Sequence, residues 1–411
     1  MKTRLTVISS LVVISCLSAG LTACGGSSDS SGVKVGAILD LSSGWTSLGK
    51  ESQAALQQAA ADYKAKTGKT VEVKVIDSAG DKDKAAAAVS TLAGEGFTVI
   101  IGPGGSSQAG AAAPIAKQKG VVLISPGSTS SALAKTSDGL LRFVPDDRVE
   151  SKATVALMDK NGVQQLVPVG RTDLGNQGLY DSVTAAWTKL KGAGSVSKGV
   201  TYPETQTKDF GKVADQVSAS VTQAQAKGKT AVYLAGFGEA AGIVSAAKAP
   251  ATSVTWYGGD GVVGDPAFTK DATVAKATQA VCLPSPQTGL SKETKATWQP
   301  VLDSLSKAAG GQADAFGVNA FDASNAAIAV LAGTGKGKTG AELETALIAY
   351  ANQTTGASGS LKLNQFGDRE VSAYDFWQVT GAPAAAKWTV TGGWSPAGGT
   401  LGTVVKAPNC G

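Results

Sequence analysis

The chain has 411 residues, with 37 Lys and Arg against 32 Asp and Glu and a formal net charge of +5. It contains no histidine, which excludes a Ser-His-Asp relay and any imidazole-based metal site. It also has no long basic run of the kind that binds nucleic acid. We therefore expect no catalytic residue, no metal, no cofactor and no nucleic-acid partner.

The first 32 residues predict an exported protein held to a membrane by lipid. Lys2 and Arg4 precede an apolar stretch, residues 5–17, that is too short to remain as a membrane anchor. The sequence Leu21-Thr22-Ala23-Cys24 then resembles the lipobox of bacterial lipoproteins. This resemblance implies a signal peptide at residues 1–23, lipidation of Cys24 and a location on the extracytoplasmic face of a cell membrane. Residues 24–32 are rich in Gly and Ser and read as a flexible tether. The alternative is an ordinary secreted protein with a chance cysteine.

About 390 residues remain after the leader, too many for one comfortable core, so two domains are expected. In the first part, short β-branched runs alternate with Ala-rich helical stretches, and Asp81 is a candidate N-cap. The predicted strands are 33–39, 71–76, 97–101 and 121–124, and the predicted helices are 50–66, 81–93 and 108–119. Such alternation is typical of a doubly wound parallel sheet.

A second α/β round begins near residue 148. Its predicted helices are 150–160, 177–191, 210–226 and 239–247, and its predicted strands are 165–169, 196–202, 231–235 and 254–258. Three helices (294–307, 320–331 and 341–351) and β segments at 361–363 and 374–379 follow. The sequence thus predicts two α/β lobes with a cleft between them.

Two cysteines remain once the leader has been removed and Cys24 has taken lipid. They are Cys282 and Cys410, and in an oxidising compartment a pair is expected to form a disulfide. Cys410 is the penultimate residue, so this bridge would hold a tail that otherwise frays.

Glycine-rich and hydroxyl-rich loops follow two neighbouring strands of the first lobe. One loop runs from Gly102 to Ser106 at the start of a helix, and the other contains Gly127 and Thr129. Helix N-terminal amides and hydroxyls at the carboxyl edge of a parallel sheet suit an anionic group such as a carboxylate. The alternative for each loop is a tight turn without a ligand.

The second lobe offers a carboxylate at an equivalent place. Asp260 follows a predicted strand between glycines, which leaves its side chain able to face a cleft, although an Asp in a simple β-turn is the alternative. Trp45 and Phe237 are aromatic residues in glycine-rich loops outside the apolar strands. These positions favour a ligand wall over a core position.

Together these stretches resemble the Leu/Ile/Val-binding branch of type I periplasmic binding proteins, the substrate-binding components of ABC importers. The resemblance runs from about residue 33 to residue 377. The matching stretches are Val33-Lys34-Val35-Gly36, Ser43-Gly44, Gly49-Lys50-Glu51, Ile101-Gly102-Pro103, Ser106-Ser107, Ala113-Pro114-Ile115-Ala116, Leu123-Ile124-Ser125-Pro126, Thr207-Lys208-Asp209-Phe210 and Gly258-Gly259-Asp260-Gly261.

The resemblance implies a role for each candidate residue in binding an amino acid. The loops of Ser106, Gly127 and Thr129 hold the ligand's carboxylate and amino group, and Asp260 pairs with the ammonium from the other lobe. Aromatic residues at Trp45 and Phe237 line the side-chain pocket. A pocket tyrosine of the family falls on Leu174 here, and the loop around Trp45 is one residue shorter, so either Trp45 or Leu48 forms the wall.

The resemblance also implies three crossings between the lobes, near residues 145, 282 and 370. Residues 33–145 and 283–370 would form the first lobe, and residues 146–282 and 371–411 the second. The expected protein is a monomer that closes around an amino acid, branched-chain or related, or another small carboxylate, and is recognised by the permease subunits of an ABC importer. The alternatives are a lipoprotein of the same fold that regulates a membrane enzyme or receptor, and a hydrolase, which the missing nucleophile elbow disfavours.

Overall fold

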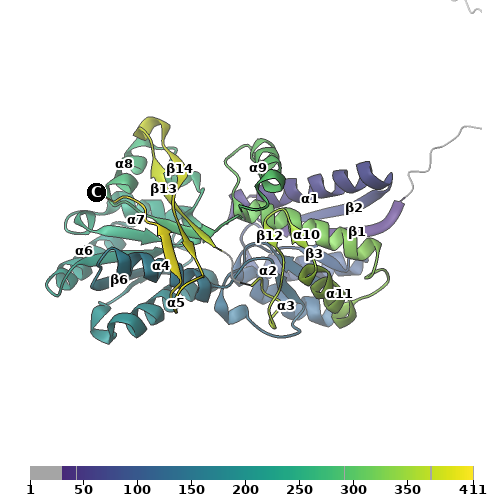
Figure 1. The fold of residues 1–411 in the computed structure, drawn as a ribbon, viewed down its shortest axis with the longest axis horizontal. Helices are drawn as coiled ribbons and strands as arrows, with labels where there is room; N and C mark the ends of the chain where they lie inside the picture. The colour runs from purple at the N-terminus through teal and green to yellow at the C-terminus, as the bar shows by residue number, and fades with distance from the viewer. Residues whose placement is uncertain (1–29, 43, 291, 371–372, 411) are drawn as a thin grey trace, which may run out of the picture.

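The computed structural model describes residues 30–42, 44–290, 292–370 and 373–410. The predicted leader, Cys24 and most of the predicted tether lie outside these residues. The described chain forms two α/β lobes side by side, each with its own sheet and helices (Figure 1). The first lobe carries α1–α3 and α9–α11, and the second carries α4–α8. The predicted two-lobed, parallel-sheet fold is confirmed.

The first lobe is built on a five-stranded sheet in the order β2-β1-β3-β4-β5, with every neighbouring pair parallel. Its strands are β1 (Ser30–Leu39), β2 (Thr70–Asp77), β3 (Val99–Ile101), β4 (Val122–Ser125) and β5 (Leu140–Arg142). Its helices are α1 (Thr46–Thr67), α2 (Lys82–Gly94), α3 (Ser106–Lys119), α9 (Lys295–Ala309), α10 (Ala315–Ala332) and α11 (Gly340–Asn352).

Alternating side chains of the central strands bury both faces of this sheet. Val35 and Ala37 of β1 pack in the cluster that contains α1, α10 and α11, whereas Ile38 packs with α2 and α3. This two-sided burial explains why the strands read as near-continuous apolar runs. The predicted N-cap Asp81 accepts hydrogen bonds from the amides of Asp83 and Lys84 at the start of α2.

The second lobe repeats the plan with a four-stranded parallel sheet in the order β7-β6-β8-β9. Its strands are β6 (Gln165–Arg171), β7 (Val200–Tyr202), β8 (Thr230–Ala235) and β9 (Thr255–Gly258). Its helices are α4 (Asp147–Lys160), α5 (Leu174–Lys191), α6 (Gly211–Gln225), α7 (Ala241–Ala246) and α8 (Ala272–Ala280). Helices α4 and α5 pack on one face of this sheet, and α6 and α7 pack on the other.

A separate antiparallel sheet in the order β10-β13-β14-β15 joins the end of the chain to the second lobe. Its strands are β10 (Ser285–Thr288), β13 (Tyr374–Thr380), β14 (Lys387–Ser395) and β15 (Thr403–Lys406), and a short hairpin, β11 (Thr355–Gly356) and β12 (Gly359–Ser360), lies between α11 and β13. Single-turn helices are η1 (Ser131–Leu133), η2 (Ala193–Ser195), η3 (Gly238–Ala240), η4 (Ala251–Ser253), η5 (Asp260–Val262), η6 (Pro266–Phe268) and η7 (Pro383–Ala385).

The position of β10 bears on where the chain crosses between the lobes. The amides of Trp256 and Gly258 in β9 donate to the carbonyls of Val281 and Pro284, and β10 then pairs with β13. The chain therefore stays beside the second lobe up to Thr288, six residues beyond the expected crossing near residue 282. We propose that the first lobe resumes after Thr288.

The Cys282–Cys410 disulfide is present and closes a loop of 128 residues. The side-chain amide of Gln378 in β13 donates to the carbonyl of Cys282 at 2.9 Å. The tail is thus held against the segment between β9 and β10, as the sequence predicts.

Helix α10 is long and apolar enough to cross a membrane, and it is the one described helix of which this is true. Most of its residues are buried within the first lobe against α1 and the sheet. Its apolar character is therefore explained by packing inside the protein.

Candidate functional site

Loops that follow parallel strands of both lobes supply the predicted binding residues. The loops after β3 and β4 carry Ser106, Gly127 and Thr129, and the loops after β8 and β9 carry Phe237 and Asp260. Ligands of open α/β sheets bind at the carboxyl ends of the strands, which is the edge that these loops share.

The two loops of the first lobe are tied directly to each other. The amide of Ser130 donates to Ser106 Oγ at 3.2 Å, and the Arg142 guanidinium donates to the carbonyls of Ser128 and Ser130 at 3.1 and 2.7 Å. Ser106 and Thr129 are both buried. Helix α3 begins at Ser106 with no side-chain cap on its first-turn amides. The structure thus brings the predicted anion-binding groups together.

At Gly127, in the loop after β4, the side chains of Leu48 and Trp45 pack so closely on the backbone that only glycine fits. A Cβ atom added to it would lie 2.5 Å from Leu48 Cδ2 and 3.3 Å from Trp45 Cζ3. Leu48 therefore packs within the first lobe, against the loop after β4, while Trp45 extends toward the second lobe. Trp45 is accordingly the residue of this pair that reaches the facing lobe.

Three aromatic rings meet between the lobes. Trp45 lies 5.5 Å from Phe237 of the second lobe and 5.1 Å from Phe316 at the start of α10, measured between ring centroids. The Arg171 guanidinium covers the Phe237 ring at 5.2 Å. Trp45 and Phe237 thus come together as the prediction requires, and Phe316, which sequence reasoning missed, completes the group.

Leu174 lies apart from the aromatic rings. Its amide donates to Ser107 Oγ at 3.1 Å, and its side chain lies near Gly110 of α3, where 36% of Leu174 remains exposed. Leu174 is the first residue of α5, and this end of the helix faces α3, so Leu174 lies at the outer edge of the contact between the two helices. The predicted place of Leu174 beside Trp45 and Phe237 does not agree with these contacts.

Asp260 is buried in a group of acidic side chains. It is 5% exposed, its amide donates to Glu150 Oε1 at 3.1 Å, and Asp147 lies in the same first turn of α4 as Glu150. Burial raises the pKa of Asp260 to about 7, and the charge of Asp314 across the cleft adds to the increase. The pKa values of Glu150 and Asp147 are raised well above the ordinary range, first by burial and then by the charge of Asp260.

A second acidic pair faces this group from the first lobe. The Asp314 amide donates to Glu51 Oε2 at 3.2 Å, and Asp314 itself caps α10 by accepting from the Phe316 amide at 2.8 Å. Burial raises the pKa of Asp314 to about 6, and burial together with the Asp314 charge raises that of Glu51. Within the described part of the chain, no group of three or more acidic, Cys or His side chains is arranged to hold a metal ion.

Sequence reasoning did not single out these further acidic residues. Asp147 and Glu150 occupy the first turn of a helix, where acidic residues are common for reasons of the helix dipole. Asp314 reads as an ordinary N-cap. Their shared burial is a property of the assembled lobes, so no local pattern marks them.

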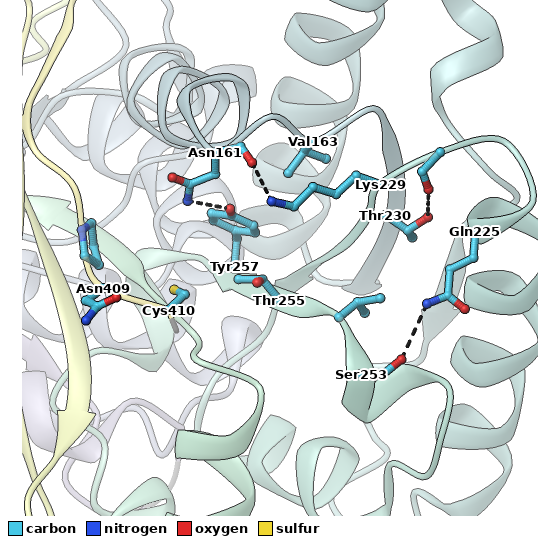
Figure 2. A pocket seen from close by; sticks show the side chains of 13 residues that line it. Asn161, Val163, Gln225, Lys229, Thr230, Ser253, Thr255, Tyr257, Asn409 and Cys410 are labelled. Carbon is cyan, nitrogen blue, oxygen red and sulfur yellow. Dashed lines mark hydrogen bonds between the residues drawn. The ribbon is translucent and has the colours of Figure 1, made fainter.

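A pocket of about 580 Å³ lies elsewhere on the second lobe (Figure 2). Figure 2 shows Lys229 donating to the carbonyl of Asn161 at 2.8 Å, and the Asn161 amide donating to the Tyr257 hydroxyl at 2.9 Å. Most of its lining residues precede or begin β6, β8 and β9, and the rest are Tyr257 and residues 408–410 of the C-terminal tail, so it opens at the amino ends of the strands. No predicted ligand-binding residue lines it, and its location is opposite to the edge where such sheets bind ligands.

Comparisons with known proteins agree with this architecture. The leucine binding protein LivK of Thermotoga maritima superposes with a TM-score of 0.72 at 20% identity, over 87% of this chain and 98% of that one. LivJ of Streptococcus pneumoniae, solved with isoleucine, gives a TM-score of 0.67 at 22% identity over 87% and 99%. A solute binding protein of R. palustris, solved with 4-hydroxybenzoate, gives a TM-score of 0.73 at 16% identity, over 88% of this chain and 97% of that one. These similarities establish the fold.

No curated protein sequence matches the chain. A family model described as periplasmic binding protein matches residues 32–383. That match includes the two parallel sheets, apart from the first two residues of β1, and all the predicted ligand-binding loops. The chain therefore belongs to the periplasmic binding protein family.

Proposed function

We propose that this protein is the solute-binding component of an ABC importer and that it holds an amino acid between its lobes. The observation that carries the proposal is Asp260, a buried carboxylate at the end of β9 that forms no ion pair with any described residue. Within the protein, Asp260 is hydrogen-bonded by the Glu150 carboxyl and by backbone amides, but no cation among the described residues faces it. A buried carboxylate without an ionic partner is costly, so a ligand ammonium at this position would be favoured.

The opposite pole of an amino acid finds its partners in the first lobe. Ser106 Oγ, the Thr129 hydroxyl and the uncapped first-turn amides of α3 are suited to a carboxylate. Trp45, Phe237 and Phe316 would line the space for the side chain. Neither lobe alone supplies all these groups, so the ligand favours the closed arrangement of the lobes.

Transport by this route requires that the protein be held outside the cytoplasm. Family membership is consistent with an extracytoplasmic location, and the LivJ and LivK proteins that share the fold are named for branched-chain amino acids. Cleavage before Cys24 and its lipidation remain predictions from the leader sequence. In the proposed cycle, permease subunits recognise the closed, loaded form of a tethered monomer.

Replacing Asp260 tests the proposal directly. The mature protein is unfolded and refolded to remove carried-over ligand, and binding of the twenty amino acids is measured by thermal shift and calorimetry. We expect Asp260→Ala to weaken binding of the best amino acid by about 100-fold or more, corresponding to roughly 3 kcal/mol, since it removes the charge partner of a buried ammonium.

The matched control is Asp215→Ala, which removes an exposed carboxylate from α6 of the same lobe. It is expected to bind as the unchanged protein does, and circular dichroism should show both variants folded. If the unchanged protein binds no amino acid, or if Asp260→Ala retains full affinity, the proposed function is wrong.

A further inference from the structure

Buried acidic side chains of both lobes lie where the lobes meet. Asp260, Glu150 and Asp147 belong to the second lobe, and Glu51 and Asp314 belong to the first. All five are buried, between 0 and 9% exposed. A Cβ atom added to Gly264 of the second lobe would lie 3.6 Å from Asp314 Oδ2, so the Asp314 carboxyl lies where the two lobes meet, and its charge also acts on Asp260.

None of the ion pairs formed by described residues includes any of these five carboxyl groups. The nearest buried cation, Arg142, is engaged by both oxygens of Asp368 and by two backbone carbonyls. Arg171 lies near Asp173 and Glu239 and covers the Phe237 ring. The charge of Arg142 acts on Asp147, but no cation among the described residues forms an ion pair with any of the five acids.

Two buried hydroxyl groups lie beside these acids and have no hydrogen-bond partner among the described residues. Tyr233 is fully buried, its hydroxyl forms no hydrogen bond within the described residues, and the charges of Glu150 and Asp260 act on it. Ser130 Oγ is likewise buried and unpartnered. A Cβ atom added to Gly178 would lie 2.8 Å from Ser130 Oγ and 2.5 Å from Asp147 Oδ2, so these two groups converge on one point. Buried polar groups ordinarily have partners, and their absence here indicates a ligand.

We propose that the cleft is built for a ligand with two positive groups, such as a basic amino acid, whose second cation lies against Glu51 and Asp314. This proposal rests on the proposed function and narrows its substrate class. A neutral amino acid brings one ammonium, which can pair with only one of these buried carboxyl groups, whereas a second cation would stabilise the ionised form of another. A purely anionic ligand such as a benzoate would add to the repulsion.

The position of the aromatic rings fits such a ligand. Helix α1 presents Trp45 at its start and Glu51 one to two turns later, and α10 presents Asp314 as its cap and Phe316 just inside. An aliphatic stem that packs on Trp45 and Phe316 would therefore lead toward the acidic pair. Aromatic faces also attract a nearby cation.

There is room beside Glu51 for the end of such a side chain. A pocket of about 320 Å³ opens between the start of α1 and residues 264–270 of the second lobe, and Glu51 lines it. Lys50, Lys270 and Asp265 also line this pocket. Both lysines are exposed and neither forms an ion pair with the cleft acids in the described structure.

The test compares two ligands that differ by one cation. Calorimetry with the refolded, ligand-stripped protein uses L-lysine and L-norleucine, which share a four-carbon side chain and differ in the terminal ammonium, with cadaverine as a dication without a carboxylate. We expect L-lysine to bind at least ten times more tightly than L-norleucine. We expect Glu51→Gln to remove most of that difference by weakening the binding of L-lysine more than that of L-norleucine. The control is Asp62→Asn, an exposed carboxylate on the same helix.

The outcomes separate the two proposals. Equal or tighter binding of L-norleucine overturns the dicationic ligand but leaves amino-acid binding intact. Binding of cadaverine alone supports the dicationic ligand and contradicts the amino-acid assignment. Failure of L-lysine and cadaverine to bind overturns the inference whatever the neutral amino acids do. Glu51→Gln retains an acceptor for the Asp314 amide, and an unchanged circular dichroism spectrum confirms that this variant folds.

Discussion

Asp260 shows how one buried carboxyl group links binding to stability. Its burial disfavours the charged form, and the Asp314 charge acts in the same direction, so its pKa rises to about 7. At neutral pH the ligand-free protein therefore holds part of this group in the protonated form. A ligand cation would reverse that preference by stabilising the carboxylate.

We expect the ligand-free protein to lose stability as the pH rises. The folded pKa of Asp260 is raised above its unfolded value, so its contribution is fully present below about pH 4 and is lost as the pH rises toward 7. Between pH 5 and the folded pKa of about 7 lie about two pH units, so the free energy of unfolding should fall by roughly 3 kcal/mol over this range. Urea unfolding at pH 5 and pH 8 measures the loss, and Asp260→Asn should reduce it. A slope unchanged by Asp260→Asn would show that other groups account for the pH dependence.

The residues that sequence reasoning identified share a local signature. Trp45, Phe237 and Asp260 each lie in a glycine-rich loop next to a strand end, and that pattern is visible without a structure. Glu150 and Tyr233 were missed because a first-turn carboxylate and a strand tyrosine look alike whether they face solvent, core or cleft. Leu174 was placed by family position alone, and its rim location reflects how α5 approaches α3.

Among the secondary-structure elements, β5 is joined by a buried ion pair to the segment between β12 and β13. Arg142 of β5 donates to both oxygens of Asp368 at 2.6 and 2.7 Å, and Arg142 is fully buried. The same guanidinium holds the carbonyls of Ser128 and Ser130, which flank Thr129. The Arg142 side chain thus joins the segment that contains Asp368 to a predicted ligand-binding loop.

We expect Asp368→Asn to destabilise the protein by about 3–5 kcal/mol, because it leaves the buried Arg142 without its charge partner. Urea unfolding at constant pH measures the change in the free energy of unfolding. Glu370→Gln is the control. Glu370 lies only two residues from Asp368 and forms an exposed ion pair with Lys362, so its loss should lower the free energy of unfolding by less than about 1 kcal/mol. Similar losses in the two variants would contradict a special role for the buried pair.

Elements differ in how well the sequence predicts them. The central parallel strands were predicted because they are buried on both faces and read as apolar runs. Strands β14 and β15 were missed because β14 contains Gly392 and Gly393, which weaken its alternating pattern, and because β15 is short and mostly exposed. The β10 segment contains Pro286 and a buried Gln287 and carries no strand signal, so its pairing with β13 depends on the tertiary fold.

At the scale of the whole molecule, contacts between the two lobes flank the proposed site. Trp45 meets Phe237 on one side, and the α3 and α5 helix starts meet on the other through Ser107 Oγ and the Leu174 amide. An amide in the first turn of a helix has no hydrogen-bond acceptor within that helix. The Leu174 amide at the start of α5 therefore has Ser107 Oγ as its acceptor only when the two lobes are in contact. Closure is therefore stabilised by contacts that do not involve the ligand.

We expect Ser107→Ala to weaken ligand binding about 5-fold without touching the ligand, since it removes a hydrogen bond of about 1 kcal/mol from the closed form alone. The loss should appear mainly as faster dissociation in stopped-flow measurements, because the closed, loaded form reopens more easily. Small-angle X-ray scattering should show the radius of gyration falling when the unchanged protein binds its ligand. Ser90→Ala removes an exposed hydroxyl from α2 of the same lobe and serves as the control. Dissociation of Ser107→Ala at the unchanged rate would mean that this rim contact does not hold the lobes closed.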